Sequence, residues 1–215
     1  RDREYLYRKK GYPASVYAAT NAGAMHAFDA LSGTEMAAYM PRRGLKRALN
    51  YASDSYSFEY MLDGPISDND VFDASRISPT TPEAEKWKGW RQLAIGTGGR
   101  GEPLVYAINA PFQQNPGRRV PGQADFLWET GPDKVNVAEG GAVLMGYPSN
   151  SVRSGQTEVF GQTDPDRGYW IAAVNNGHYN GQTDGSKSGL VVLNAKTGAV
   201  IRNIPLPGGF SAGRG

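Results

Sequence analysis

Three segments of this sequence repeat one short pattern of strand and turn. In each, an apolar residue is followed by Asp or Asn and then by Ala, at Phe28-Asp29-Ala30, Ile108-Asn109-Ala110 and Leu193-Asn194-Ala195. Strand-forming residues precede each of these positions, and small polar residues with Gly follow the first and third of them. The pattern therefore predicts a repeated β unit.

The unit recurs about every 80 residues, which is longer than the ~40–50 residues of a compact propeller blade. Long insertions account for the difference, and the 28 Gly and 14 Pro residues are typical of a chain with many turns. Each copy predicts three strands, and a fourth is predicted ahead of the second and third copies, at 64–74 and 140–148. Short helices are expected only at 44–52 and 82–90.

Several predicted strands are apolar on both faces, which favours sheets that are covered on both sides by neighbouring sheets. The predicted fold class is therefore all-β: an incomplete, quinoprotein-like β-propeller of about two to three four-stranded antiparallel blades with long insertion loops. We expect part of a blade at 12–41 and further blades at 63–131 and 140–207. Because a propeller needs at least about four blades to close, we expect the chain to be a fragment of a larger protein.

The polar residue of each repeat is interpreted as a turn cap. Asp29, Asn109 and Asn194 each end a strand, where an Asp or Asn side chain can accept hydrogen bonds from the backbone N–H groups of the next turn. This interpretation gives the three residues a structural role and no catalytic one.

The strongest metal candidate is an acidic segment ahead of the second repeat. Its oxygen-bearing side chains suit calcium, which takes 6–8 oxygen ligands in flexible geometry. The segment lacks the Gly and Glu positions of an EF-hand loop, so an exposed blade corner with turn-capping acids is the competing interpretation. The residues concerned are Asp63, Asp68, Asn69, Asp70 and Asp73.

Other chemistry-bearing residues favour structural roles. The loop 175–189 holds His178 and a single carboxylate, Asp184, and His26 lies in an alternating strand. The chain has no Cys, no GxSxG motif and no GK[ST] ending to its glycine-rich segment 96–101, which is expected to be a hairpin turn. Aromatic residues in or beside the insertions either contact a ligand or cover a blade edge; they are Tyr51, Tyr56, Tyr60, Trp87 and Trp90.

Charge and hydropathy exclude two classes of partner. The formal net charge is only +2, so no nucleic-acid partner is expected, and no apolar stretch approaches the ~20 residues of a membrane span. Small basic pairs are interpreted as solvated loop charges; they lie at 42–43, 46–47 and 118–119.

The order of several motifs resembles the C-terminal β-propeller of the PilY1/PilC family of type IV pilus assembly and tip-associated adhesin proteins. The single motif HAFDALSG is shared by quinoprotein-like propellers, whereas DGPISDNDVF leading into WRQLAIGTGGRG is more specific. The resemblance covers nearly the whole chain, through the segments 15–41, 60–72, 90–110, 126–129 and 189–204.

This resemblance implies an extracellular protein at the bacterial cell surface or pilus tip, without enzyme activity. It implies a role in pilus assembly, surface attachment and twitching motility, with minor pilins, the remainder of the propeller and a host or surface ligand as partners. Some family members bind calcium in a loop C-terminal to the last residue here, and this sequence has no such loop. No cofactor is therefore expected in this segment, and calcium is expected only elsewhere in the full-length protein.

Two alternatives to this function remain open from the sequence. A quinoprotein-type dehydrogenase shares the propeller architecture and binds pyrroloquinoline quinone and calcium, but this chain lacks the vicinal Cys pair often found in such enzymes. An intracellular propeller scaffold of the WD type would carry Gly-His and Trp-Asp dipeptides, which are absent.

Overall fold

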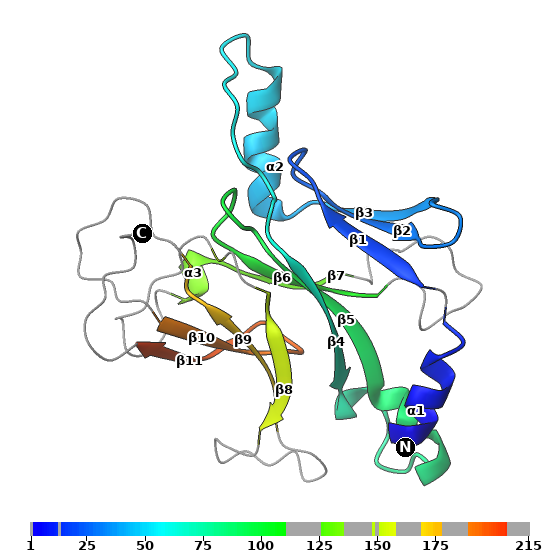
Figure 1. The fold of residues 1–215 in the computed structure, drawn as a ribbon. Coiled ribbons are helices and arrows are strands. Elements are labelled where there is room, and N and C mark those ends of the chain that lie inside the picture. The colour runs from blue at the N-terminus through cyan, green and yellow to red at the C-terminus, as the bar shows by residue number, and fades with distance from the viewer. Residues whose placement is uncertain are drawn as a thin grey trace.

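Three antiparallel sheets make up most of this computed structural model (Figure 1). It describes residues 2–12, 14–110, 126–135, 148, 151–157, 169–177 and 189–205. The first sheet contains β1 (Ser15–Ala19), β2 (Met25–Asp29) and β3 (Glu35–Tyr39). The second contains β4 (Ile66–Phe72), β5 (Trp90–Thr97), β6 (Val105–Asn109) and β7 (Phe126–Thr130). The third contains β8 (Arg153–Thr157), β9 (Tyr169–Asn175), β10 (Gly189–Asn194) and β11 (Val200–Pro205).

In all three sheets the strands follow one another in sequence order, and neighbouring strands are antiparallel. The second sheet lies between the other two, and its central strands are buried on both faces. Leu93 and Val105 belong to a core shared with the third sheet, whereas Ala94 and Tyr106 belong to a core shared with β2 of the first. The predicted all-β, incomplete propeller-like fold is confirmed.

The sequence repeat coincides with a repeated irregularity of the backbone. The register shifts immediately before Phe28, Ile108 and Leu193, which are the three aligned apolar positions. A β-bulge of this kind increases the twist of a strand and is a fixed feature of its sheet. The alanines two residues later also share a contact, because each donates its backbone N–H to a carbonyl at 2.9–3.0 Å; the pairs are Ala30 with Ala14, Ala110 with Gln92, and Ala195 with Trp170.

The turns after the first and third repeats have the same geometry. The backbone carbonyls of Asp29 and Asn194 each accept a hydrogen bond of 2.8 Å from the glycine four residues later, Gly33 and Gly198. Both glycines have a left-handed backbone, with φ of 69° and 70°. The Asp29 side chain also accepts from two backbone N–H groups, and the Asn194 side chain accepts from that of Lys196. Asn109 ends β6 at the equivalent position, and the residues after Ala110 lie outside the described part.

These two glycines give a matched pair of substitutions. Gly33→Ala should lower the free energy of unfolding by about 1 kcal/mol, because only the left-handed backbone is strained and nothing lies within 4 Å of the added Cβ. In Gly198→Ala the Cβ would lie 2.6 Å from the Trp128 ring, which should cost about 1–3 kcal/mol more. Urea denaturation of both variants measures the difference, and equal costs would contradict the packing seen at Gly198.

The fourth strand of each four-stranded sheet was predicted with unequal success. The expected strand at 64–74 is β4, so this prediction is confirmed. In the third sheet β8 pairs with β9, so the prediction that 140–148 is its fourth strand is wrong. The sequence RSGQT of β8 is polar and contains Gly155, and it therefore carries little strand signal. The segment 140–148 itself lies outside the described residues, apart from Pro148.

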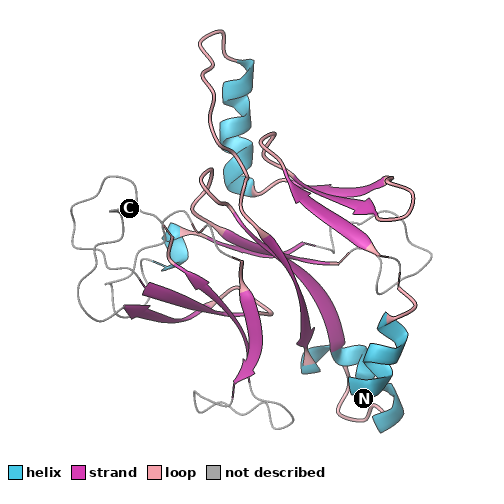
Figure 2. Cartoon of the chain, in the orientation of Figure 1, coloured by secondary structure: helices cyan, strands magenta, loops and turns pink. Residues whose placement is uncertain are grey.

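Short helices connect or flank the strands (Figure 2). The two predicted helical segments correspond to α2 (Arg42–Ala48) with the 3₁₀ helix η1 (Leu49–Ala52), and to the 3₁₀ helix η3 (Glu83–Gly89). Three further helices were not predicted: α1 (Asp2–Lys9), η2 (Ala74–Arg76) and α3 (Pro132–Val135). In the described part of the chain, none of the helices has the length and apolar character needed to span a membrane.

The helices α2 and η1 and the returning segment 53–62 stand out from the sheets as a projection, which comprises residues 42–62 (Figure 1). Its base lies beside the first and second sheets. The projection and the edge strands β3 and β7 together form the candidate site.

Candidate functional site

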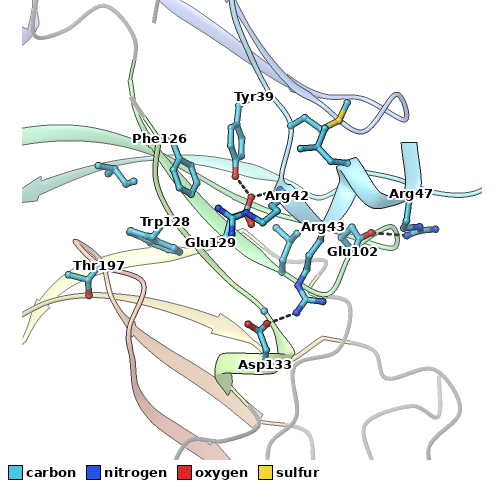
Figure 3. Close-up of a pocket in the computed structure, with 15 residues that line it drawn as sticks. Tyr39, Arg42, Arg43, Arg47, Glu102, Phe126, Trp128, Glu129, Asp133 and Thr197 are labelled. Atoms are coloured by element: carbon cyan, nitrogen blue, oxygen red, sulfur yellow. Dashed lines mark hydrogen bonds and ion pairs between the residues drawn. The ribbon is translucent and has the colours of Figure 1, made fainter. Parts of the chain in front are cut away.

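An open cleft of about 890 Å³ lies where α2 meets the edge strands of the first and second sheets (Figure 3). β3 and β7 form two of its sides, and Thr197 from the turn of the third sheet reaches its border. All three sheets therefore contribute to the cleft. The side chains used in the argument below are Tyr39, Arg42, Arg43, Leu45, Arg47, Glu102, Phe126, Trp128, Glu129 and Asp133.

Aromatic side chains form one wall of the cleft. Tyr39 of β3 stacks on Phe126 of β7, with ring centroids 5.3 Å apart and planes 20° apart. Tyr39 also contacts the buried ring of Tyr106 at 5.4 Å. Phe126 remains 41% exposed, whereas Trp128 is buried. The wall therefore presents an exposed apolar ring on a support that is fixed by packing.

Each carboxylate that lines the cleft accepts a hydrogen bond from a neighbouring residue. Glu129 accepts from the Tyr39 hydroxyl and, at 2.7 Å, from the backbone N–H of Arg42. Asp133 forms an ion pair with Arg43. Burial, reinforced by the contact with Glu129, raises the pKa of the Tyr39 phenol far above its ordinary value. Tyr39 therefore stays protonated and donates to Glu129 at every physiological pH.

Arg47 joins the helix of the projection to its returning segment and to the second sheet. Its guanidinium lies 2.8 Å from Glu59 and 3.2 Å from Glu102, and it also donates to the Gly101 carbonyl. Burial alone would lower the pKa of Arg47, but the hydrogen bonds with both carboxylates outweigh it and raise this pKa. Burial raises the pKa of Glu102, and Arg47 partly offsets this increase. The ion pairs hold the base of the projection in one position.

A second set of contacts fixes the returning segment. The Asn21 side chain donates to the Glu59 carbonyl at 2.9 Å and accepts from the Met61 backbone N–H at 3.0 Å. The Tyr51 hydroxyl donates to the Asn21 carbonyl. The turn between β1 and β2 thus supports the projection from the side of the first sheet.

The predicted calcium residues lie along β4 and at its two ends. Asp70 accepts from Tyr5 and from Lys9, both at 2.7 Å. Asp68 accepts from the Gln92 side chain. These contacts anchor α1 and β5 against β4.

The remaining members of this set have other partners. Asn69 accepts from the backbone N–H of Ser154 at 3.2 Å, and Asp63 accepts from that of Arg100 at 2.6 Å. Asp73 caps η2 and pairs with Arg91. Within the described residues, no three His, Cys, Asp or Glu side chains are grouped as they would be around a metal ion. Calcium binding by this segment stays a prediction.

Of the other candidates, His26 lies on β2, where its Nδ1 is 2.7 Å from Glu35, and its ring stacks on Phe28. His178 and Asp184 lie outside the described residues. In the glycine-rich segment 96–101, the backbone N–H of Gly98 donates to the Leu104 carbonyl, which makes a tight connection between β5 and β6.

The predicted aromatic candidates divide into two groups. Tyr51, Tyr56 and Tyr60 are exposed on the projection. Trp90 stacks on Tyr5 of α1 and also contacts Trp170, and Trp87 lies beneath the Arg8 guanidinium at 4.3 Å. The tryptophans therefore cover a sheet edge, whereas the tyrosines remain available to a ligand.

Sequence reasoning did not single out Tyr39, Phe126 or Glu129. These residues meet only because β3 and β7 lie beside each other in space, although about 90 residues separate them, as for the Tyr39–Glu129 pair. The segments that carry them were predicted as strands, but their pairing across two sheets leaves no local signal.

The fold and the cleft define an all-β, propeller-like binding module. No protein-family model matches the sequence. The chain is 28% identical over 183 residues to the type IV pilus biogenesis factor PilY1 homolog of Xylella fastidiosa. This alignment covers 85% of the chain and 12% of the relative's length. The chain is therefore related to the PilY1 family and corresponds to a small part of that relative.

Proposed function

We propose that the chain is a non-enzymatic extracellular module of a type IV pilus biogenesis factor, at the bacterial cell surface or pilus tip. The observation that carries this proposal is the relationship to a pilus biogenesis factor over 85% of the chain. The same residues form the propeller-like sheets and the cleft between them, so the proposal applies to the folded unit described above.

The chemistry of the cleft supports binding in preference to catalysis. General acid–base catalysis needs a side chain that is positioned to exchange a proton with the substrate. The carboxylates of Glu129 and Asp133 are instead held by Tyr39 and Arg43, and Glu102 is held by Arg47. The exposed surface that remains is aromatic, aliphatic and cationic, which suits recognition of another protein.

Within this function, we assign the chain to pilus assembly, with minor pilins and the rest of the propeller as partners. Surface attachment through a host or surface ligand and twitching motility would then depend on the assembled pilus. Calcium is part of the proposal only for other regions of the protein. The quinoprotein-dehydrogenase alternative is not favoured by any feature of the described residues.

The test is genetic replacement in the bacterium that encodes the protein. We expect that deleting the gene removes pilin from the sheared surface fraction and abolishes twitching zones, because assembly fails without the biogenesis factor. The wild-type gene should restore both, and so should a control variant with Leu31→Asp, a residue that is 92% exposed in a turn of the first sheet. Normal surface pilin and normal twitching in the deletion strain would contradict the proposal.

A further inference from the structure

The projection exposes an unusual amount of apolar side chain. Leu45 is 54% exposed and Leu49 is 77% exposed, and they lie four residues apart on one side of the α2–η1 helix. Phe58 on the returning segment is 68% exposed. Large apolar groups that gather on one surface commonly mark an interaction site.

The cleft continues onto this helix. Arg42 and Leu45 line the cleft together with Tyr39 and Phe126, and Leu49 follows one helical turn beyond Leu45 (Figure 3). We call the five residues Tyr39, Arg42, Leu45, Leu49 and Phe126 the docking face. It extends from the stacked aromatic wall, past one cation, to the exposed leucines.

The docking face is held in place before any partner binds. The Arg47 ion pairs and the Asn21 hydrogen bonds tie the projection to the first and second sheets. Tyr39 is fixed by Glu129 and by stacking on Phe126. A preorganised apolar surface loses little conformational entropy on binding, which favours affinity.

The charge of this region indicates the chemistry of the occupant. The sequence of α2, RRGLKRA, carries four cations and no acid. The nearby carboxylates already have partners: Glu129 accepts from Tyr39, and Asp133 pairs with Arg43. No ion pair among the described residues involves the exposed Arg42 guanidinium. An incoming carboxylate would therefore complement Arg42, whereas an incoming cation would meet uncompensated positive charge.

We propose that the docking face binds an acidic amphipathic segment of a partner protein, with a carboxylate on Arg42 and apolar side chains on Leu45 and Leu49. This inference deepens the proposed function and rests on it for the identity of the partner as a component of the pilus system. The recognition chemistry itself follows from the cleft and the helix.

The test uses two synthetic amphipathic helical peptides with the protein as the bacterium makes it. One peptide combines leucines at i, i+3, i+4 and i+7 with glutamates, and the other has every Glu replaced by Lys. By fluorescence anisotropy we expect the Glu peptide to bind at least about tenfold more tightly than the Lys peptide. This preference should narrow as salt is added, because exposed charges are screened.

Variants then locate the binding site. Arg42→Glu should reverse the preference between the two peptides, and Leu49→Asp should weaken binding of the Glu peptide by about tenfold or more. Leu31→Asp replaces an equally exposed leucine outside the docking face and should leave both affinities unchanged. Circular dichroism of each variant establishes that it is folded.

Several outcomes would overturn the proposal. These are equal affinity for the two peptides, absence of binding, or binding that ignores Arg42→Glu and Leu49→Asp. Self-association that Leu49→Asp abolishes would assign the face to a second copy of the protein. Binding that emerges only after residues 113–123 are replaced by a Gly-Ser linker would assign it to the chain's own segment.

The peptide assay and the genetic test fail independently. If the gene deletion removes pili but neither peptide binds, the docking inference is wrong and the proposed function stands. If the Glu peptide binds as expected but pili are normal in the deletion strain, the proposed function is wrong and the recognition chemistry stands.

Discussion

Replacing Trp128 with Ala is expected to lower the free energy of unfolding by about 3–5 kcal/mol. The Trp128 side chain is only 4% exposed and belongs to the core shared by the second and third sheets. Its indole Nε1 also donates to the Ala195 carbonyl at 3.0 Å. The substitution would remove the buried ring, leave a cavity and deprive a buried carbonyl of its donor. This loss is a large fraction of the 5–15 kcal/mol typical of a folded domain.

Two further variants separate the causes of this effect. Trp128→Phe keeps an aromatic ring but cannot donate to Ala195, so it should cost less than Trp128→Ala. Trp87→Ala makes the same chemical change at a partly exposed site beside Arg8 and should cost clearly less than Trp128→Ala. Urea denaturation followed by far-UV circular dichroism measures all three. A Trp128→Ala variant as stable as Trp87→Ala would contradict the shared core.

The sequence predicted those parts of the fold that the repeat encodes. Phe28, Ile108 and Leu193 were aligned by their pattern alone, and the structure places a register shift immediately before each. Pattern matching works here because the bulge and the turn are local, and every copy of the unit must solve the same steric problem.

The sequence could not predict features that depend on contacts between distant segments. The polar strand β8 is defined by pairing with β9 and by the hydrogen bond from Ser154 to Asn69, 85 residues apart. The cleft likewise requires the approach of Tyr39 and Glu129. Helix α1 was missed because it is held by tertiary contacts, such as the stacking of Tyr5 on Trp90.

The acidic segment illustrates a more specific ambiguity. Clustered Asp residues were predicted either to bind calcium or to cap turns, and composition alone does not separate the two. The structure provides Asp73 with protein partners: its Oδ1 accepts at 2.7 Å from the Ser75 hydroxyl, and its Oδ2 pairs with Arg91. Lys196 of the third sheet approaches within 3.7 Å. Asp73 therefore links η2, the start of β5 and the turn after β10.

Replacing Asp73 with Ala is expected to destabilise the chain by about 3–5 kcal/mol at neutral pH, because it leaves a buried cation without its partner. The side chains of Asp73 and Arg91 are 6% and 11% exposed. In the double variant Asp73→Ala with Arg91→Met, both charges are absent and part of the stability should return. Asp54→Ala is the control at an exposed carboxylate and should stay within about 0.5 kcal/mol of wild type.

The same contacts predict how the effect of Asp73 depends on pH. Burial alone would raise the pKa of the Asp73 carboxyl, but the Ser75 hydrogen bond and the charges of Arg91 and Lys196 outweigh it and hold the pKa below the ordinary value of 3.8. A carboxyl whose pKa is lower in the folded state contributes its stability fully well above pH 3.8 and loses it as the pH falls through the folded-state pKa. The wild type should therefore lose this contribution on acidification, whereas Asp73→Asn has none to lose.

Thermal denaturation of the wild type and Asp73→Asn between pH 7 and pH 3 measures this difference. The gap in Tm should be widest at neutral pH and should narrow as the carboxyl of the wild type takes up a proton. A gap that stays constant across this range would mean that the pKa of Asp73 is not lowered by its partners. Calcium that raised the Tm of the wild type but not of Asp73→Asn would instead support the metal-binding interpretation of the acidic segment.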